Sequence, residues 1–460
     1  MSADGLRASE EKMRGEGVPE VAIDTFRRLY EQLAAGESGL LGDDQIEPVD
    51  EIESASDLPD HGDAGRQALD HTVAIKLNGG LGTSMGLERA KSLLTVRGEL
   101  TFLDVIARQV LALRERHGAR LPLVLMNSFH TREESLAALE RYPELAADVP
   151  SDFVQNMEPK LEVESLTPID WPREPELEWC PPGHGDLYTA LVTSGMLDAL
   201  LERDYRYAFV SNSDNLGAVL DPGILGWLAS ERVPFAMEVA DRTAADRKGG
   251  HLARRADGAL VLREIAQTPE EDLDSFQDID RFRHFNTNSL WIDLRSLSEV
   301  LAGNDNVLAL PMIRNRKTVD PGDSGSPAVW HLETAMGAAI SVFDGARALR
   351  VGRERFAPVK TTNELLGVRS DRYTLTQDAR VVTADGVRPS LLVELDSEHF
   401  KLLGDFERRF AHGPPSLAAC DRFAVRGDVR FGADVVVRGE VEIGSEGEAT
   451  TVEDGTVLEG

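Results

Sequence analysis

Four short apolar runs, separated by segments of helical periodicity, restrict the folds open to this chain more than any other feature. The runs lack the polar alternation of half-exposed strands and span residues 73–77, 121–126, 207–211 and 235–239. Helical spacing marks residues 101–116, with Thr101 as N-cap, and residues 186–201, while Thr131 and Glu134 have the spacing of a capping box. The pattern predicts an α/β fold with a mostly parallel mixed sheet and helices on both faces.

The two ends of the chain depart from this pattern. Residues 21–33 predict a helix and residues 43–63 an acidic linker, so that residues 1–70 form an N-terminal segment. After residue 385, apolar residues recur every six positions between glycine bends: Val425, Phe431, Val437 and Ile443 in one series, Val429, Val435 and Val441 in another, with Gly427, Gly432, Gly439 and Gly444. This period indicates a small β-helix or an antiparallel meander in a separate domain, residues 386–460, which could self-associate.

Composition excludes several classes of function. The formal charge of -31 argues against binding to nucleic acid or to an anionic membrane, since both need a basic patch. Two cysteines, Cys180 and Cys420, are too few for a disulfide framework or a zinc site, so a bound metal would need oxygen ligands. The first residues lack the apolar core of a signal peptide, and no apolar run approaches about eighteen residues. We therefore expect a cytoplasmic protein.

The most distinctive stretch is KLNGGLGTSMG, residues 76–86, directly after the first apolar run. Glycines at this place let the backbone approach a ligand, and successive N–H groups can converge on a phosphate. A tight connection that binds nothing would have the same composition. The spacing of Gly80, Gly82 and Gly86 does not fit the dinucleotide-binding fingerprint, and no Gly-Lys-Ser/Thr closes a P-loop.

This stretch and several others resemble the eukaryotic-type UTP-glucose-1-phosphate uridylyltransferases, or UDP-glucose pyrophosphorylases. The resemblance continues, in order and over nearly the whole chain, through AKSLLTVRGELTFLD, PPGHGDLY, FVSNSDNLGA, FNTNSLW, HLETAMGAAISVF and FAPVKTTNELL. It implies a Rossmann-like nucleotidyltransferase domain over residues 71–385 and a C-terminal β-helix domain. It also implies a reversible reaction in which UTP and glucose 1-phosphate give UDP-glucose and pyrophosphate, with Mg²⁺ as cofactor.

Such a reaction needs charge neutralisation and positioning, because the attacking sugar phosphate is already ionised near neutral pH. The resemblance implies that Lys91 and Lys360 are the catalytic lysines and that Asp214 holds Mg²⁺. A lysine before an apolar run, or an aspartate after a strand, is by itself more often a solvated flank or a turn cap. The nucleotide-binding residues implied are Leu77, Asn78, Gly79, Gly80, Lys91, Gln155, Gly183, Asp214 and Lys360.

Polar residues elsewhere are expected to hold the sugar phosphate. The resemblance implies His184, Asn212, Ser213, Asp214, Glu264, Asn286 and Asn288. A histidine between two glycines could equally be a turn residue, and Glu264 could equally form a salt bridge at the edge of the core. The chain departs from the family pattern at Met157 and Glu158, where the family commonly has bulkier or basic residues, and this changes the charge balance expected around the uracil base. It also has Ala90 in place of a common proline.

Two other functions remain open from the sequence. The sugar could be an N-acetylhexosamine or one of a broader range, which would require a roomier pocket. The chain could also be a nucleotide-sugar-binding protein without activity, although such a protein would not need Lys91, Asp214 and Lys360 together. An NAD-dependent oxidoreductase is disfavoured by the glycine spacing.

Overall fold

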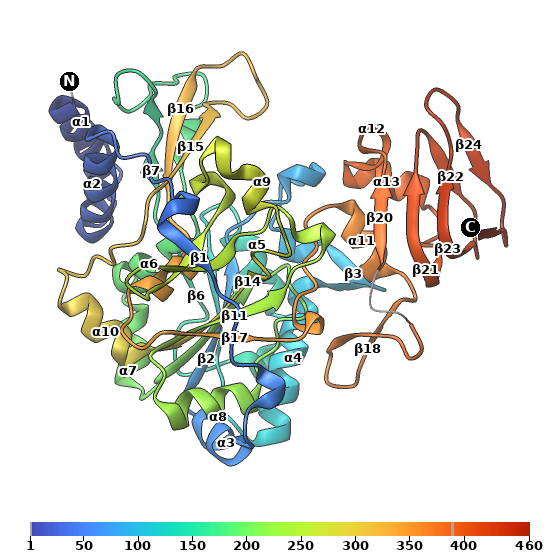
Figure 1. Cartoon of the computed structure of the whole chain (residues 1–460), viewed down its shortest axis with the longest axis horizontal. Coiled ribbons are helices and arrows are strands. Elements are labelled where there is room, and N and C mark those ends of the chain that lie inside the picture. The colour runs from blue at the N-terminus through green and yellow to red at the C-terminus, as the bar shows by residue number, and fades with distance from the viewer. Residues whose placement is uncertain (1, 388–390) are drawn as a thin grey trace.

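The fold is built on a central sheet of ten strands. The computed structural model describes residues 2–387 and 391–460. The main path of the sheet is β1-β12-β14-β10-β2-β5-β6, with β11, β13 and β17 paired beside it (Figure 1). These strands are β1 (Ile46–Pro48), β2 (Thr72–Asn78), β5 (Leu123–Asn127), β6 (Asp152–Val154), β10 (Tyr207–Asn212), β11 (Phe235–Asp241), β12 (His251–Arg255), β13 (Leu260–Arg263), β14 (His284–Asp293) and β17 (Arg347–Arg350).

The middle of this sheet contains a topological switch point. β10, β2, β5 and β6 are parallel neighbours. The chain leaves β2 toward β5 and β6 and later returns to place β10 on the other side of β2. Open α/β sheets bind ligands at the carboxyl ends of the strands at such a point. The next neighbour, β14, runs antiparallel to both β10 and β11.

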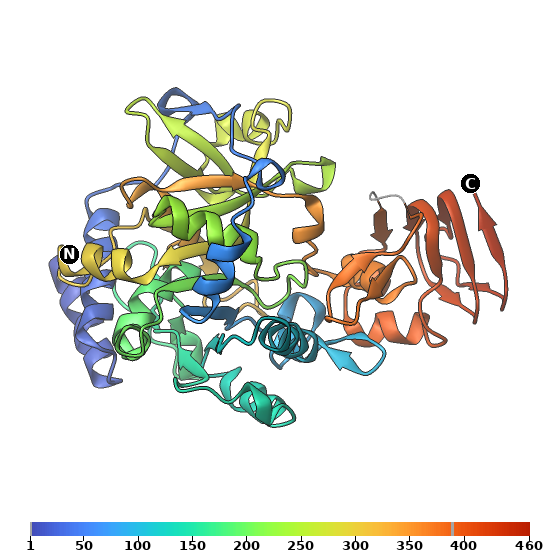
Figure 2. The same cartoon turned by 90° about the horizontal axis from the view of Figure 1, so that it is seen from below.

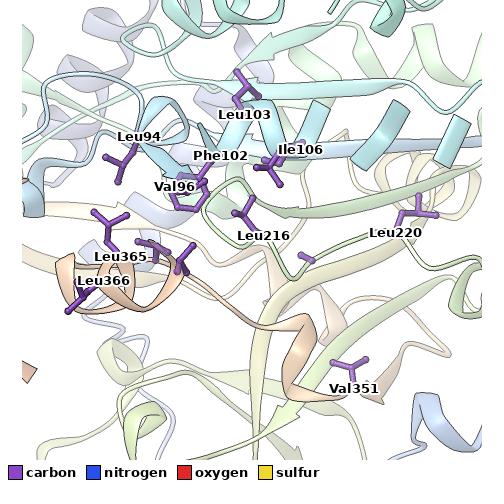
Figure 3. Close-up of a cluster of buried hydrophobic side chains, with 14 of the residues drawn as sticks. Leu94, Val96, Phe102, Leu103, Ile106, Leu216, Leu220, Val351, Leu365 and Leu366 are labelled. Atoms are coloured by element: carbon purple, nitrogen blue, oxygen red, sulfur yellow. The ribbon is translucent and has the colours of Figure 1, made fainter. Parts of the chain in front are cut away.

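Apolar residues on the strands alternate between two cores, one on each face of the sheet. On β10, Phe209 belongs to the first core and Val210 to the second. Helices α4 (Phe102–His117) and α8 (Pro222–Glu231) contribute to the first core, and α6 (Leu187–Thr193), α7 (Met196–Glu202) and α10 (Leu294–Ala302) to the second. In Figure 3, Leu365 and Leu366 of α11 (Thr362–Arg369) lie beside Leu94 and Val96 in the first core. Burial on both faces explains the uninterrupted apolar runs.

The predicted strands of this sheet are confirmed, and one helix prediction is wrong. Thr101 caps α4 by accepting a hydrogen bond from Asp104 N, as expected. The single helix predicted over residues 186–201 is instead two helices, because Gly195 has a left-handed φ of 72° between α6 and α7. The capping box predicted at Thr131 is also wrong: its hydroxyl accepts from Ser128 N, and α5 (Arg132–Leu139) begins without a side-chain cap.

The N-terminal segment packs against the central part of the chain. α1 (Ser2–Gly15), which the sequence analysis did not predict, packs against α2 (Glu20–Ala34), and their core includes Leu161 and Leu332. β1 lies within the predicted acidic linker and pairs with β12, and α3 (Gly62–Leu69), which begins at the end of that linker, packs on α8. The central part of the chain, after residue 70, also contains the smaller strands β3 (Thr95–Arg97), β4 (Leu100–Thr101), β7 (Glu158–Pro159), β8 (Leu161–Glu162), β9 (Trp179–Cys180), β15 (Ile313–Thr318) and β16 (Ala328–Glu333), and the short helix α9 (Leu273–Phe276).

The C-terminal strands lie at the opposite end of the molecule from α1 and α2 (Figures 1 and 2). β20-β21-β23-β25 and β22-β24 form two sheets, and all their pairings are parallel, which excludes an antiparallel meander. The valines and phenylalanines of the six-residue period are buried, and Phe410 stacks on Phe431 with ring centroids 4.8 Å apart. The elements are β18 (Tyr373–Leu375), β19 (Val381–Thr383), β20 (Leu392–Leu395), α12 (Ser397–Phe400), α13 (Leu403–Arg409), β21 (Ser416–Val425), β22 (Val429–Phe431), β23 (Val436–Ile443), β24 (Thr450–Val452) and β25 (Val457–Glu459).

Through the described ranges, every helix is too short or too polar to cross a membrane.

Candidate active site

The glycine loop and the segment that carries Asn212, Ser213 and Asp214 meet where β2 and β10 end, at the switch point. Asn212 is in register with Leu77, and Ser213 N donates to Leu77 O at 3.1 Å. The glycine loop therefore leaves the sheet beside the segment that carries Asp214. Both segments follow the carboxyl ends of buried parallel strands, the place where this class of sheet binds its ligands.

The glycine loop folds back on itself and returns Lys91 to its beginning. Leu81 and Ala90 form an antiparallel bridge, and Lys91 N donates to Gly80 O at 3.2 Å. Lys91 Nζ then pairs with Asp214 Oδ2 at 2.7 Å. Ala90 is fully buried in this bridge, so the departure from the family's proline leaves the return of the loop intact.

Asp214 combines one paired and one unpaired carboxylate oxygen. Its Oδ1 is buried and has no hydrogen-bond partner among the residues that the structure describes. An orphaned carboxylate oxygen beside a polyphosphate loop suits Mg²⁺, which is commonly bound by one or two carboxylates together with substrate phosphates and water. No cluster of three or more potential metal-binding side chains occurs within residues 2–387 and 391–460. A single protein carboxylate therefore fits this metal.

Lys360 reaches the same place from a third segment. Val359 N donates to Asp214 O at 3.1 Å, and Pro358 bridges with Asn215, so the backbone beside Lys360 is bound to the loop after β10. Lys360 is exposed and acts electrostatically on Glu264. Burial raises the pKa of the Glu264 carboxyl, and the Lys360 cation opposes that rise.

Gln155 lies directly against the glycine loop. A Cβ on Gly79 would approach Gln155 Oε1 to 2.8 Å, so the absence of a side chain at Gly79 makes room for the Gln155 amide. Asn78 points the other way: its Nδ2 donates to Asn127 Oδ1 and Ser135 Oγ inside the core, at 2.7 and 2.8 Å. The side chain of Asn78 thus holds the strand end, which leaves its backbone to face a ligand.

The segment around His184 is fixed by the loop that follows β16. Gly183 has a φ of 78°, and a Cβ there would lie 2.6 Å from Thr334 O. His184 Nδ1 accepts from Met336 N at 3.0 Å, so the ring carries its proton on Nε2 when neutral. Burial lowers the pKa of His184, although Glu333 opposes the change. A neutral imidazole that carries its proton on Nε2 can donate to a phosphate or hydroxyl oxygen.

Asn286 and Asn288 form a pair at the start of β14. Asn286 Nδ2 donates to Asn288 Oδ1 at 2.8 Å, and Asn288 has a left-handed φ of 58° where the pairing with β11 shifts register. Asn286 also contacts Gly337, whose added Cβ would lie 2.7 Å from Asn286 Nδ2. Such a bulge re-aims side chains beside functional sites.

Contacts, together with the electrostatic influence of Lys360 on Glu264, link most of the predicted residues in a ring. From His184 it passes through the 334–337 loop to Asn286, whose N donates to Gly250 O; Gly250 packs against Glu264. From Glu264 the ring continues through Lys360, Asp214, Lys91, the glycine loop and Gln155. It closes where Asn156 N and Nδ2 donate to the Asp186 carboxylate at 2.5 and 2.9 Å, two residues from His184.

Several members of the ring carry no role in the sequence analysis. Thr334, Met336 and Gly337 lie in the quoted stretch HLETAMGAAISVF, and that match was the signal that could have found them. Asp186 was hidden inside a predicted helix, and burial raises the pKa of its carboxyl to about 7.

The structure explains the two departures from the family pattern near the expected uracil site. Met157 packs into the core of the N-terminal helices, and the carboxylate of buried Glu158 accepts from Leu332 N at 3.2 Å. Both side chains therefore have contacts outside the ring.

A glycine loop at a switch point, two lysines and a carboxylate oxygen without a partner among the described residues are the groups that a nucleotidyltransferase needs. Comparison with known proteins makes the assignment specific. The family model of UTP–glucose-1-phosphate uridylyltransferase matches residues 23–438. This chain belongs to that family.

Individual relatives agree with the family over nearly their whole length. The UTP–glucose-1-phosphate uridylyltransferase of Hordeum vulgare is 39% identical, with 99% of this chain and 95% of the relative covered. A solved UDP-glucose pyrophosphorylase variant from Leishmania major, in complex with UDP-glucose, has a TM-score of 0.94 at 44% identity over 99% and 98% of the two chains. A solved structure of the UDP-glucose phosphorylase from Trypanosoma brucei has a TM-score of 0.91 at 43% identity, over 99% of this chain and 98% of that one.

Proposed function

We propose that this chain transfers UMP from UTP to glucose 1-phosphate, reversibly, to form UDP-glucose and pyrophosphate, and that the ring of residues described above is its active site. The observation that carries the proposal is the pairing of Lys91 with Asp214 beside Lys360, at the switch point of the sheet. Positive charge from two loops and one free carboxylate oxygen meet there, as a transfer between two anions requires.

The transfer itself needs no general base. An ionised oxygen of glucose 1-phosphate attacks the α-phosphorus of UTP in line with the bond to the β-phosphate. The new O–P bond forms as the bond between the α-phosphorus and the bridging oxygen breaks, and the electron pair leaves with pyrophosphate. Lys91 neutralises the leaving β- and γ-phosphates, and Lys360 binds the phosphates that react.

Magnesium is the proposed cofactor, held through the free Oδ1 of Asp214. When bound, it would bring the charged α-phosphate and the sugar phosphate together and reduce their repulsion. Chelation and re-addition of Mg²⁺, with isothermal titration in the presence of UTP, tests this assignment. Binding of the metal to Asp214→Ala as tightly as to the wild type would count against it.

The two halves of the product are recognised by two sets of residues. Leu77, the backbone of Asn78, Gly79 and Gly80, Gln155 and Gly183 bind the uridine nucleotide; a side-chain amide matches the adjacent carbonyl and N–H of uracil. His184, Asn212, Ser213, Glu264, Asn286 and Asn288 bind the sugar phosphate, because they offer neutral donors and acceptors to hydroxyl and phosphate oxygens.

The wider organisation is also part of the proposal. Residues 1–70 are an N-terminal segment, residues 71–385 a catalytic domain and residues 386–460 a β-helix, for which the parallel pairing of β20-β21-β23-β25 is the support. Both cysteines are buried free thiols, which suits a reducing cytoplasm.

Self-association would use the edge strand β25. Val457 on that strand is 47% exposed, and unpaired strand edges are ready partners for another copy. Light scattering of the wild type and of Val457→Glu tests this. A larger assembly that the substitution dissociates supports the proposal, and a monomeric wild type contradicts it.

The decisive experiment on function measures pyrophosphate release from UTP with a panel of hexose 1-phosphates, using ATP, GTP and dTTP as controls. Release with UTP and glucose 1-phosphate alone supports the proposal in full. Release with N-acetylhexosamine 1-phosphates or several sugars would assign a broader UDP-sugar enzyme, and no release with any pair would favour a binding protein.

A further inference from the structure

We propose that Asn215 is a positioning residue for the transfer, because its side chain fastens the loop that carries Asp214 to the segment that carries Lys360. The inference rests on the proposed function and adds a residue to which no role in substrate binding is given. Asn215 is 2% exposed and lies immediately after Asp214 in the stretch FVSNSDNLGA.

The side chain of Asn215 uses both its donor and its acceptor across the two segments. Asn215 Nδ2 donates to Arg355 O at 3.2 Å, and Asn215 Oδ1 accepts from Ala357 N at 2.9 Å. The same oxygen accepts from Gly217 N at 3.2 Å, which closes a turn in its own loop. An asparagine meets all three demands, whereas an aspartate loses the donor and an apolar residue loses all of them.

The backbones run together at the same place. Asn215 and Pro358 form an antiparallel bridge, and Val359 N donates to Asp214 O at 3.1 Å. Gly217 lies so close to the other segment that a Cβ would approach Glu354 O to 2.5 Å. Asp214 is therefore bound to the residue before Lys360, and Asn215 contacts Pro358, Ala357 and Arg355 upstream of it.

Both segments are in turn tied to buried charges of the sheet. Arg355 donates through two nitrogens to the carboxylate of fully buried Glu238, at 2.6 and 2.8 Å. Lys76 Nζ donates to Ser211 Oγ and Ala218 O, at 2.6 and 2.9 Å, and so holds both ends of the Asp214 loop. Because each segment is fixed to the sheet, the contacts of Asn215 determine the position of one segment relative to the other.

The chemical consequence follows from the geometry of in-line transfer. A displacement of about 1 Å in a reacting group can lower a rate by roughly a hundredfold. Without the side chain of Asn215, Arg355 O and Ala357 N each lose a partner, and the backbone that leads to Lys360 is held by fewer contacts. The benefit of the Lys360 charge should then fall, although the lysine is still present.

A double-mutant cycle tests this coupling. We expect Asn215→Ala to lower kcat at least about tenfold, with the KM for UTP changed less than about threefold. Lys360→Ala should cost at least about a hundredfold in the wild type and less than about tenfold in the Asn215→Ala background. Thr72→Val is the matched control, because it removes a buried side-chain hydrogen bond, to Ala68 O, at the other end of β2.

Hydrogen exchange provides a readout that does not depend on activity. The amides of Ala357 and Val359 should exchange faster in Asn215→Ala and at the wild-type rate in Thr72→Val. If Asn215→Ala does not fold, Asn215→Asp replaces it in the cycle, since it retains the two acceptor contacts and loses the donation to Arg355 O.

The possible results separate this inference from the proposed function. If Lys360→Ala costs the same in both backgrounds, or if exchange at 357 and 359 is unchanged, Asn215 does not position Lys360 and the inference is overturned. The proposed function survives that result, because Lys360→Ala alone remains impaired. Full activity of Lys360→Ala in the wild type would instead remove Lys360 from the proposed active site, and this inference with it, while the absence of pyrophosphate release by the wild type would remove the proposed function.

Discussion

Lys91 Nζ lies 2.7 Å from Asp214 Oδ2, and the two residues follow adjacent parallel strands. The cation that would bind the leaving phosphates and the carboxylate that would bind magnesium thus hold each other in the free protein. Both side chains are largely buried, so the cost of removing them from water offsets much of their attraction and the net contribution of the pair to folding is small. The relationship therefore predicts effects on turnover with small effects on stability.

Asp214→Ala should reduce turnover by at least about a hundredfold, the scale of losing one preorganised charge contact. Steady-state pyrophosphate release and thermal unfolding measure the two effects separately. Asp198→Ala, on the exposed face of α7, is the control for removal of a carboxylate. A normal rate in Asp214→Ala would mean that the metal is held elsewhere.

Lys360→Ala should show a loss of the same order, at least about a hundredfold, in kcat. The side chain is exposed, so the folded state should be as stable as the wild type. Lys401→Ala removes another exposed lysine and should keep the wild-type rate. Equal rates for the two variants would show that the position of Lys360 beside Asp214 has no part in the reaction.

Gly79→Ala should weaken nucleotide binding. The added Cβ would approach Gln155 Oε1 to 2.8 Å, so the amide proposed to bind uracil must move. We expect the KM for UTP to rise about tenfold while kcat changes less, the pattern of a lost binding contact. Gly404→Ala, whose Cβ would meet only Arg408 Nη1 at 3.6 Å, is the control. An unchanged KM would place the base away from Gln155.

Lys76→Met should change how stability depends on pH. Burial, together with the Arg355 cation, lowers the pKa of Lys76 to about 7, far below the roughly 10.4 of an unfolded chain. Between these values the unfolded chain binds more protons, so wild-type stability gains up to about 1.4 kcal/mol per pH unit from this group as pH rises. Below pH 7 the cost of the buried charge is fully present.

Urea unfolding at pH 7, 8 and 9 measures this slope. The methionine variant lacks the titrating group, so its slope should be flatter than that of the wild type, with a constant offset for the lost contacts to Ser211 and Ala218. Lys401→Met should keep the wild-type slope. Parallel curves for the wild type and Lys76→Met would show that Lys76 does not titrate in this range.

The sequence allowed the strands and the glycine loop to be predicted for simple physical reasons. Strands buried on both faces must be apolar throughout, as Val73 and Ile75 on one face and Ala74 on the other illustrate. The six-residue spacing of Val425, Phe431 and Val437 reflects side chains that enter one narrow core. That spacing can be recognised directly in the sequence, because it involves residues close together in the chain.

What the sequence did not reveal depends on distant partners. The break between α6 and α7 depends on the left-handed φ of Gly195, and a single glycine in a sequence does not reveal which φ it adopts. The hydroxyl of Thr131 is taken by Ser128 N, a competing local bond that the spacing to Glu134 cannot exclude. The contact of Met336 N with His184 joins positions 152 residues apart, so only the fold brings them together.

The direction of β14 has a consequence for how such an enzyme can change. Asn286 and Asn288 occur near the beginning of that strand, whereas the glycine loop and Asp214 follow the ends of theirs, because β14 runs against its neighbours. Two of the residues proposed to bind the sugar therefore lie at the entry of one strand, and the residues proposed to move the phosphate lie at the exits of others. A substitution at Asn286 or Asn288 can thus change the proposed sugar contacts while it leaves the strand ends that carry the glycine loop and Asp214 intact.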